Sequence, residues 1–421
     1  MAALGAAHRL REAGAPYVMF DKGTHPGGHT KTYLYPGGWT FDDGPHVSFT
    51  SDARIQDILA DQIDGDYNAV PTGVNNYWQG HWIKHPAQCN LYGLPVDLVV
   101  ACIEGFVEAS SALISNYEDW LYATYGRVFA DTFPMPYTRK VHTTDARNLT
   151  ADWMGPRMYR PSLDEVLRGA LSRDTPEVHY IDRFRYPIAG GFYSYLSPLH
   201  KTSDLRMEHD LVRLSPVEKV LHFASGQQES YAHLVSSIPL PVLVPMIDGT
   251  PPEVIEASAA LAATSCVIVN VGIDREEDSG YSWTYYYDED FIVTRLSYPH
   301  RYAQSNVPAG CAAFQCEIYF SDKYRPMTEP AESYIEPAIE DLRRCGLITP
   351  EDEILLSDAK LSPHAGIIFD HDRPSALRVV HDYLDELGIR YCGRFGDWDY
   401  LWTDDSFISG ERAAQSVLEG R

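Results

Sequence analysis

The first 28 residues follow an order that few folds use. Met1–Ala13 is rich in small residues and predicts a helix, and Tyr17–Phe20 predicts a short buried strand that ends at Asp21. A glycine-rich loop with Gly27 and Gly28 follows. Helix, tight turn, strand and acidic residue in this order make up the second half of a β-α-β unit, which in parallel sheets binds a dinucleotide. The sequence therefore predicts a Rossmann-like α/β domain.

The first half of this unit would precede Met1. In such units an acidic residue about 20 positions after the glycine turn binds the ribose hydroxyls. Asp21 stands at that distance from a turn that would end just before Met1. The first strand and its G-x-G turn are therefore missing from the printed sequence. We expect a coding start further upstream; the alternative is a chain that binds its dinucleotide poorly.

Charge and composition exclude several classes of protein. Of the 421 residues, 44% are hydrophobic and 22% are charged, as in ordinary globular proteins, and the net charge is −25. Such a surface repels nucleic acids and anionic lipids. We see neither a secretory leader nor an apolar run near the roughly 18–20 residues that span a bilayer. Seven scattered cysteines without a CxxC pair indicate reduced thiols. We predict a soluble cytoplasmic protein without a metal site.

The order of the remaining elements predicts interleaved domains. Helices are expected within 95–133, and strands at 266–273, 282–287, 292–297 and 312–320. Dinucleotide-type segments stand at both ends of the chain, with the other elements between them. We predict a dinucleotide-binding domain from residues 1–50, 201–264 and 375–421, a helical insert over 51–135, and a mixed β-sheet domain that binds substrate from 136–200 and 265–374.

The C-terminal segment combines a glycine turn with a capped helix. Gly393 allows the backbone to lie close to a ligand, and polar residues that favour helix N-termini precede a helix predicted from about Asp405 to Leu418. The N-terminus of a helix carries partial positive charge, which suits an anionic or electron-accepting ring. An ordinary capped helix would have the same sequence pattern.

This segment, GRFGDWDYLWTDDSFISGERAA over 393–414, closely resembles the flavin-binding segment of the UDP-galactopyranose mutases. More broadly, it resembles the amine oxidase and protoporphyrinogen oxidase group of flavoproteins. The likeness recurs in order along the chain, which makes chance an unsatisfactory explanation. The further matching segments are the half-unit with Gly27 and Gly28, Phe41–Val47 (FDDGPHV), Tyr77–Pro86, Pro136–Val141 (PYTRKV), Arg185–Gly191 and Leu234–Leu240.

The resemblance implies FAD bound in an extended conformation. Asp21 would bind the adenosine ribose, and Gly27 and Gly28 would lie near the pyrophosphate and the ribityl chain. Val217, in a strand over 217–220, would contact the adenine. The flavin ring would be held by the C-terminal turn and the helix start, through Gly393, Asp405, Ser406 and Phe407.

The resemblance also implies which residues act on the substrate. His46 would stand beside the flavin ring. Arg394 and Tyr400 match the spacing of the substrate arginine and tyrosine of the eukaryotic mutases, and Arg295 matches a second arginine for phosphate. Lys140 would be catalytic or would position a water. Four of these residues have a structural alternative: Arg394 could pair with a nearby carboxylate, Tyr400 could belong to the core, and Arg295 and Lys140 could be solvated.

Because the mutases isomerise a sugar ring without net redox change, the resemblance predicts an FAD-dependent enzyme that acts on a nucleotide-activated sugar or a similar polar substrate through flavin N5. Three departures leave an FAD-dependent oxidoreductase open as an alternative, which would transfer hydride from substrate to flavin. Pro45 replaces a glycine, His142 replaces a tryptophan, and 361–373 lacks the expected tyrosines. A scaffold without cofactor is a further alternative.

Overall fold

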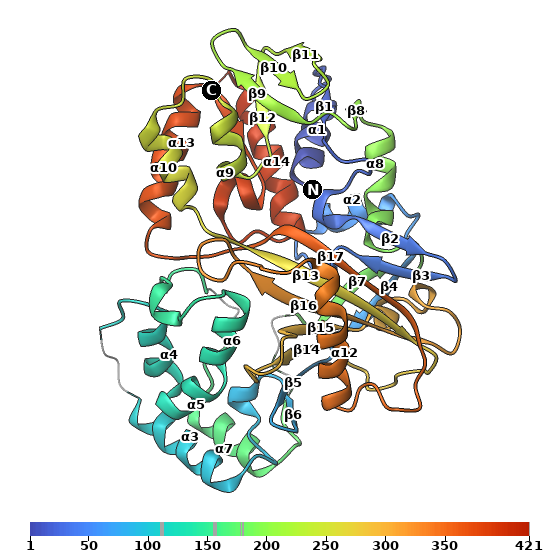
Figure 1. Cartoon of the computed structure of the whole chain (residues 1–421), viewed down its shortest axis with the longest axis vertical. Coiled ribbons are helices and arrows are strands. Elements are labelled where there is room, and N and C mark those ends of the chain that lie inside the picture. Colours follow the sequence, from blue (N-terminus) through green and yellow to red (C-terminus); the bar gives the residue numbers. More distant parts are fainter. Residues whose placement is uncertain (110–112, 155–157, 177, 179–180, 421) are drawn as a thin grey trace.

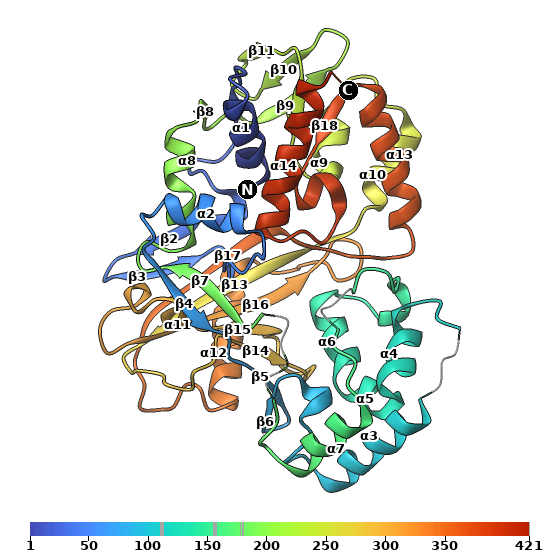
Figure 2. The same ribbon diagram turned by 180° about the vertical axis from the view of Figure 1, so that it is seen from behind.

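The computed structural model describes residues 1–109, 113–154, 158–176, 178 and 181–420. The molecule is elongated, with an α/β body at one end, a large sheet in the middle and a helical insert at the other end (Figure 1). The N- and C-termini both lie in the α/β body (Figures 1 and 2). Segments far apart in the chain therefore build one part of the molecule.

Two pairs of short parallel strands lie inside the α/β body. β1 (Met19–Phe20) pairs with β8 (Leu205–Arg206), and β12 (Leu234–Ser236) pairs with β18 (Ile389–Tyr391). The other elements of this body include a three-stranded antiparallel sheet and the surrounding helices. They are α1 (Ala2–Glu12), α8 (Ser197–Lys201), β9 (Leu211–Ser215), β10 (Val220–Phe223), β11 (Gln228–Ser230), α9 (Leu240–Leu243), α10 (Pro252–Ala260), α13 (Arg373–Glu386) and α14 (Thr403–Leu418).

Helices α1 and α14 lie in direct backbone contact because glycine stands at both contact points. A Cβ on Gly5 would lie 1.9 Å from the carbonyl oxygen of Phe407, and a Cβ on Gly410 would lie 1.8 Å from that of Ala2. No side chain fits at either point. This contact explains the small residues at the start of the chain, and it brings the N-terminal half of α14 against α1 (Figure 2).

The central sheet has seven strands, and every neighbouring pair is antiparallel except β14 and β5. This is the mixed sheet that the sequence predicts. In spatial order its strands are β17 (Ile354–Ile367), β13 (Ala263–Ile273), β16 (Ala312–Phe320), β15 (Arg295–Ser297), β14 (Trp283–Tyr286), β5 (Val74–Trp78) and β6 (His81–Lys84). One face of the sheet is covered by α12 (Ile335–Arg344) (Figure 1).

The two-residue period of the strands separates a structural face from a functional face. Val267 and Val269 in β13 and Ile318 in β16 belong to the core that α12 closes. The intervening residues of the same strands point to the other face, where Glu317 and Tyr319 stand. In β16, which is buried along its whole length, this alternation places polar side chains on one face of the sheet.

The helical insert contains α3 (Val96–Glu108), α4 (Tyr117–Tyr125), α5 (Arg127–Thr132), α6 (Pro134–Val141) and α7 (Leu163–Leu171). These helices continue beyond the predicted boundary at residue 135. Smaller elements connect the insert and the sheet to the α/β body. They are β2 (Thr32–Tyr35), β3 (Trp39–Asp42), α2 (Ala53–Asp61), β4 (Tyr67–Pro71), β7 (Arg183–Pro187) and α11 (Pro299–Tyr302).

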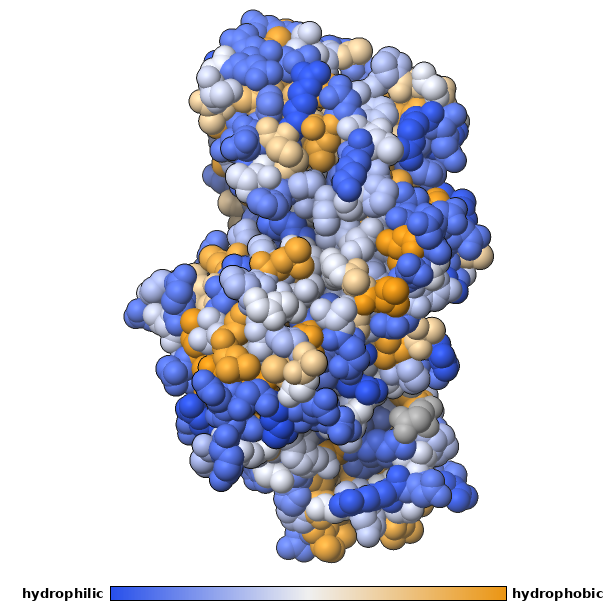
Figure 3. Space-filling view, turned by 90° about the vertical axis from the view of Figure 1, so that its right-hand side faces the viewer, coloured by the Kyte–Doolittle hydropathy of each residue, from blue (hydrophilic) through white to orange (hydrophobic). Residues whose placement is uncertain are grey.

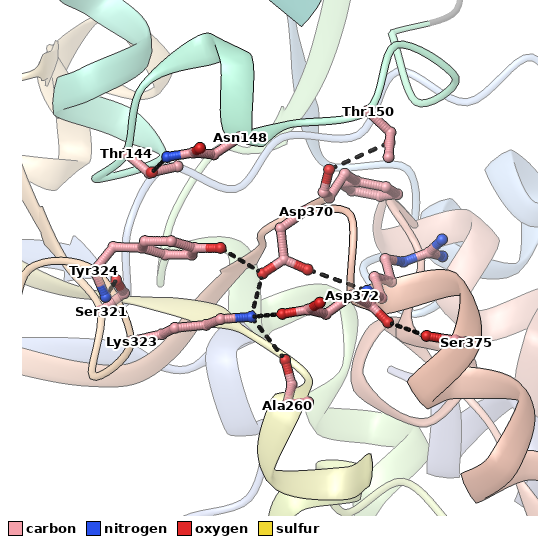
Figure 4. Close-up of polar contacts among 12 residues, drawn as sticks. Thr144, Asn148, Thr150, Ala260, Ser321, Lys323, Tyr324, Asp370, Asp372 and Ser375 are labelled. Carbon is pink, nitrogen blue, oxygen red and sulfur yellow. Dashed lines mark hydrogen bonds and ion pairs between the residues drawn. The ribbon is translucent and has the colours of Figure 1, made fainter. Parts of the chain in front are cut away.

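A polar cluster joins all three parts at the loop that follows β16 (Figure 4). Lys323 Nζ donates to Asp370 Oδ2 at 2.7 Å, to Asp372 Oδ2 at 2.9 Å and to the carbonyl oxygen of Ala260 at 3.3 Å. Tyr324 Oη donates to the same Asp370 oxygen at 2.8 Å. From the insert, Thr150 N–H donates to the carbonyl oxygen of Phe369 at 2.8 Å. The loop therefore ties the sheet to α10 and to the start of α13.

Three features differ from the sequence-based expectation. Val217 lies in the turn between β9 and β10 and not in a strand, because Pro216 cannot donate a ladder hydrogen bond and the chain reverses there. The last helix begins at Thr403, before the predicted Asp405, and the N–H of Trp402 donates to Asp405 Oδ2 at 3.2 Å. The long strand β17 was not predicted at all.

Candidate functional site

One cavity of about 890 Å³ connects the three parts of the molecule. At the α/β end it is lined by the first residues of α1, by Gly27 and Gly28, and by the first turn of α14. It continues over the face of the central sheet that carries Glu317 and Tyr319, and it ends among aromatic side chains of the insert. A ligand that reaches from the helix N-termini to the insert would therefore contact all three parts of the molecule.

The α/β end of the cavity has the features of an anion-binding site. Met1 and Ala2 of α1 line it together with Thr403 and Ser406 of α14. The first N–H groups of a helix have no partner within the helix and carry partial positive charge. Two helix N-termini at one end of a cavity therefore suit a group with phosphates and an electron-accepting ring.

Gly28 leaves room for such a group. Its φ is +56°, and a Cβ added to it would meet nothing within 4 Å. Any side chain at this position would therefore project into open space on the cavity wall. The glycine loop, the two helix N-termini and the cavity volume of about 890 Å³ fit a dinucleotide cofactor.

The loop after β3 presents His46 to the cavity. His46 Nδ1 donates to the carbonyl oxygen of Gly44 at 2.9 Å, which leaves Nε2 as a hydrogen-bond acceptor. Burial lowers the pKa of His46 to about 4. The ring is therefore neutral at neutral pH and can accept a proton or a hydrogen bond, but it adds no positive charge.

The sheet face under this loop carries an ion pair. Arg295 in β15 and Glu317 in β16 are direct partners across the two strands, and both line the cavity. Arg295 Nε donates to Glu317 Oε2, and Nη2 donates to Oε1 at 2.8 Å. Tyr319 Oη donates to Oε1 of the same carboxylate at 3.1 Å. The carboxylate thus holds the guanidinium plane in one orientation.

Arg394 and Tyr400 line the cavity from a π-helical turn, Arg394–Trp398, and the residues after it. Arg394 Nε and Nη2 donate to the carbonyl oxygen of Leu401 at 2.8 and 2.6 Å, and Nη1 donates to that of Ala365 at 3.1 Å. The guanidinium carbon lies 5.4 Å from the centre of the Tyr400 ring. These contacts fix the side chain between β17 and α14.

The first 61 residues match the family model of an NAD(P)-binding Rossmann-like domain. Over the whole chain the structure is similar to solved structures of a mutase and of oxidases. For a reduced UDP-galactopyranose mutase the TM-score is 0.93 with 23% identity, over 99% of this chain and 92% of that one.

The chain has the fold of UDP-galactopyranose mutase. The predicted likeness to these mutases is therefore confirmed at the level of the fold, and the Rossmann-like α/β class is confirmed with it. A protein from Exiguobacterium sp. 255-15 that is assigned as a protoporphyrinogen oxidase has a TM-score of 0.74 with 14% identity, over 100% of this chain and 96% of that one. For a putrescine oxidase with a redesigned cofactor-binding site the TM-score is 0.66 with 14% identity, over 99% of this chain and 96% of that one.

Within this mutase fold, the structure brings most of the predicted site residues together. Gly27, Gly28, His46, Arg295, Gly393, Arg394, Tyr400 and Ser406 all line the one cavity. The remaining predicted site residues do not line this cavity. Asp405 caps α14, and Phe407 is buried against His8, with 5.5 Å between the ring centres. Asp21 Oδ1 accepts from the N–H of Gly23 at 2.7 Å, and Val217 is exposed on its turn.

Lys140 is also away from the cavity wall. It lies in the last turn of α6, where it is buried, and its Nζ donates to the carbonyl oxygens of Tyr286, Asp288 and Val293 at 2.8 to 3.0 Å. Burial lowers its pKa to about 7. These three bonds join α6 to the sheet, so the residue is neither solvated nor next to a ligand in the cavity.

Sequence reasoning missed several cavity residues. Glu317 could have been found, because it is the one acidic residue in an otherwise uncharged run, Ala312–Phe320. Tyr137 and Tyr285 meet edge to face with 5.4 Å between ring centres, and burial raises the pKa of both phenols, so they remain neutral donors. No pattern in the chain indicates that these two tyrosines meet.

Two properties concern the described residues only. Among them, no group of three or more histidine, cysteine or acidic side chains is arranged to hold a metal ion. No helix in the described ranges has both the length and the apolar character needed to cross a bilayer.

Proposed function

We propose that this chain is an FAD-dependent enzyme that acts on a nucleotide-activated sugar or a similar polar substrate. One observation carries the proposal. A single cavity joins a dinucleotide-type end, formed by two helix N-termini and a double glycine, to a sheet face with Arg295 and several tyrosines, and Arg394 lines the same cavity from the turn before α14. The similarity of the fold to a UDP-galactopyranose mutase supports this choice of cofactor and substrate class.

The residues that would hold FAD are the first turns of α1 and α14, together with Gly27, Gly28 and Gly393. When bound, FAD supplies a ring nitrogen, N5, that can form a bond to an anomeric carbon or exchange a hydride with a substrate. The helix N-termini stabilise negative charge on phosphates and on a reduced ring, because their N–H groups are fixed in place before the reaction.

The substrate would lie between the sheet face and the insert. Arg295 and Arg394, each held in one orientation by its neighbours, would donate to phosphate oxygens, and Tyr400 would donate a further hydrogen bond. His46, neutral through burial, offers Nε2 as an acceptor for a hydroxyl proton. Aromatic residues of the insert, among them Tyr125 and Phe129, would exclude water from the reacting atoms.

The same aromatic wall favours a second candidate, an FAD-dependent oxidoreductase. The insert end of the cavity is lined by Tyr117, Tyr125, Phe129 and Trp153, which suit a substrate with an apolar part that needs no phosphate contact. A protoporphyrinogen oxidase and a putrescine oxidase share the fold. We also propose a cytoplasmic location, which agrees with seven cysteines that are all free thiols.

Absorbance and turnover separate these possibilities. The purified chain is saturated with FAD, and its visible spectrum is recorded after removal of free cofactor. The protein is then reduced with dithionite and incubated with UDP-galactopyranose without oxygen. We expect a flavin spectrum and formation of the ring isomer at constant flavin redox state. Oxygen uptake with an amine or another reduced substrate would favour the oxidoreductase. A protein that retains no flavin would contradict both.

A further inference from the structure

The end of α6 places a histidine in the wall of the cavity. His142 follows the last residue of this helix, and its ring meets that of Trp153 edge to face, with 5.0 Å between ring centres. Both residues line the cavity. Trp153 is itself fixed, because its Nε1 donates to the carbonyl oxygen of Thr150 at 2.9 Å and its ring stacks on Phe369. One side of the imidazole therefore lies against a rigid aromatic surface.

The residue after His142 has a strained backbone. Thr143 has a φ of +61°, a left-handed conformation that β-branched residues rarely adopt. Its hydroxyl donates to the carbonyl oxygen of His142 at 2.6 Å and hydrogen-bonds to the hydroxyl of Ser321, in the loop after β16, at 2.7 Å (Figure 4). These contacts end α6 at His142. Strain of this kind persists only where the surrounding structure holds it, and it concentrates at functional sites.

The imidazole of His142 has no hydrogen-bond partner among the residues that the structure describes. The other histidines of the cavity wall each have one through Nδ1: His29 with Ser362, His46 with Gly44 and His85 with Asn76. A polar side chain on the outer surface is hydrated, and much of the face seen in Figure 3 is hydrophilic. His142 is partly buried and faces a cavity. A ligand that fills this part of the cavity must supply its hydrogen bonds.

The charge state of His142 limits what that ligand group can be. Burial lowers the pKa of the ring to about 4, so the imidazole is neutral at neutral pH and has one donor and one acceptor nitrogen. A phosphate or carboxylate is best matched by a cation, which this position disfavours. A hydroxyl both donates and accepts, so it can bond to either ring nitrogen in either tautomer. The imidazole therefore fits an uncharged hydroxyl group.

We propose that His142 determines specificity by binding a hydroxyl group of the substrate at the insert end of the cavity. The inference rests on the proposed function, and it names one group that the substrate must carry there. A ligand without the hydroxyl would displace water and leave both ring nitrogens unpaired, and sites built in this way reject such analogues strongly. The aromatic wall thus accepts a sugar or ribose hydroxyl and disfavours a wholly apolar substrate.

Binding of UDP-galactopyranose to the FAD-saturated protein, measured by calorimetry, tests the proposal. His142→Phe keeps the ring contact with Trp153 but removes both nitrogens, and we expect the dissociation constant to rise by about tenfold or more. His142→Gln keeps a donor and an acceptor and should stay within about threefold of the wild type. The matched control is His81→Phe. His81 stacks on Trp78 outside the cavity, and its change should leave binding within about twofold.

UDP separates the two sources of the hydroxyl. If the sugar supplies it, His142→Phe leaves the affinity for UDP unchanged, and if the ribose supplies it, UDP binds more weakly as well. Circular dichroism and the unfolding midpoint confirm that each variant is folded. An unchanged affinity of His142→Phe for UDP-galactopyranose would overturn the proposal.

Phenol and toluene test His142 separately from the proposed function, because neither probe needs a nucleotide site. Nitrogen-15 NMR follows the ring signals of His142, which are assigned by their loss in His142→Phe. We expect phenol to shift these signals and to bind the wild type about fivefold or more tightly than toluene. Equal binding of the two probes would overturn the proposal. Selective binding of phenol without any binding of UDP-galactopyranose would support the role of His142 and contradict the nucleotide sugar as substrate.

Discussion

Arg295 and Glu317 face each other across β15 and β16 and form a two-pronged ion pair on the cavity side of the sheet. The Glu317 side chain is 6% exposed and the Arg295 side chain 31%. The pair is therefore intermediate between a buried and a solvent-exposed ion pair. Each side chain depends on the other to compensate its charge.

Removing one partner of this pair should destabilise the fold. Glu317→Ala leaves the guanidinium of Arg295 partly buried without its carboxylate, and we expect the free energy of unfolding to fall by about 2–3 kcal/mol. Urea denaturation measures it. Arg168→Ala breaks the fully exposed pair with Asp164 and should leave the unfolding midpoint unchanged. Equal effects of the two changes would show that the cavity pair contributes no more to stability than the exposed pair does.

The pH dependence of stability should report on Lys140. Burial lowers its pKa in the folded protein to about 7, whereas the unfolded side chain keeps an ordinary value near 10.5. Between these values the unfolded chain binds one more proton than the folded chain, so stability contributed by this residue rises with pH. It is smallest below pH 7, where both states are protonated.

Lys140→Met provides the reference for that measurement. The difference in unfolding free energy between wild type and this variant should grow by about 1 kcal/mol per pH unit between pH 7.5 and 9. Denaturation in urea at pH 6, 7.5 and 9 yields the three differences. A difference that stays constant over this range would mean that the lysine keeps its proton in the folded state, held by the three carbonyl oxygens around Nζ.

Cofactor content should depend on the open space at Gly28. Gly28→Val places a side chain in the cavity, and we expect the amount of bound flavin to fall at least tenfold, measured by absorbance after gel filtration. Gly226→Val is the matched control. Gly226 also has a positive φ, of +84°, and open space around its Cβ, but it lies in the turn between β10 and β11, outside the cavity. Equal flavin in both variants would contradict the assignment of the glycine loop.

The cluster around Lys323 should hold the insert in place. Lys323→Met leaves the carboxylate of Asp370, which is 2% exposed, without its cation, and we expect a loss of about 2 kcal/mol in unfolding free energy. Hydrogen exchange of amides in α6 should become faster, because the loop after β16 also bonds the end of that helix through Thr143 and Ser321 at 2.7 Å. Lys201→Met, an exposed change on α8, should alter neither value. If hydrogen exchange in α6 did not change, the cluster would stabilise only its own loop and not the position of the insert.

The elements near the chain ends could be predicted from the sequence. Small residues in Met1–Ala13, the strand that ends at Asp21 and the double glycine define a Rossmann-like unit through local patterns alone. The start of a helix is harder to predict, as at Thr403, because several polar residues in a row could each cap the first turn. The strand β17 was not predicted because its alternating residues include charged and small ones, together with one proline, Pro363, and one glycine, Gly366.

Patterns of neighbouring residues were enough to predict the fold class, the glycine loop and the two candidate arginines, because each depends on residues close together in the chain. The contacts of Arg295 with Glu317, of Lys140 with three carbonyl oxygens and of Tyr137 with Tyr285 are seen in the folded chain and in no local pattern. These pairs come from segments 22 to 153 residues apart. Their meeting depends on how strands register and how the insert packs on the sheet, which no local pattern of residues specifies.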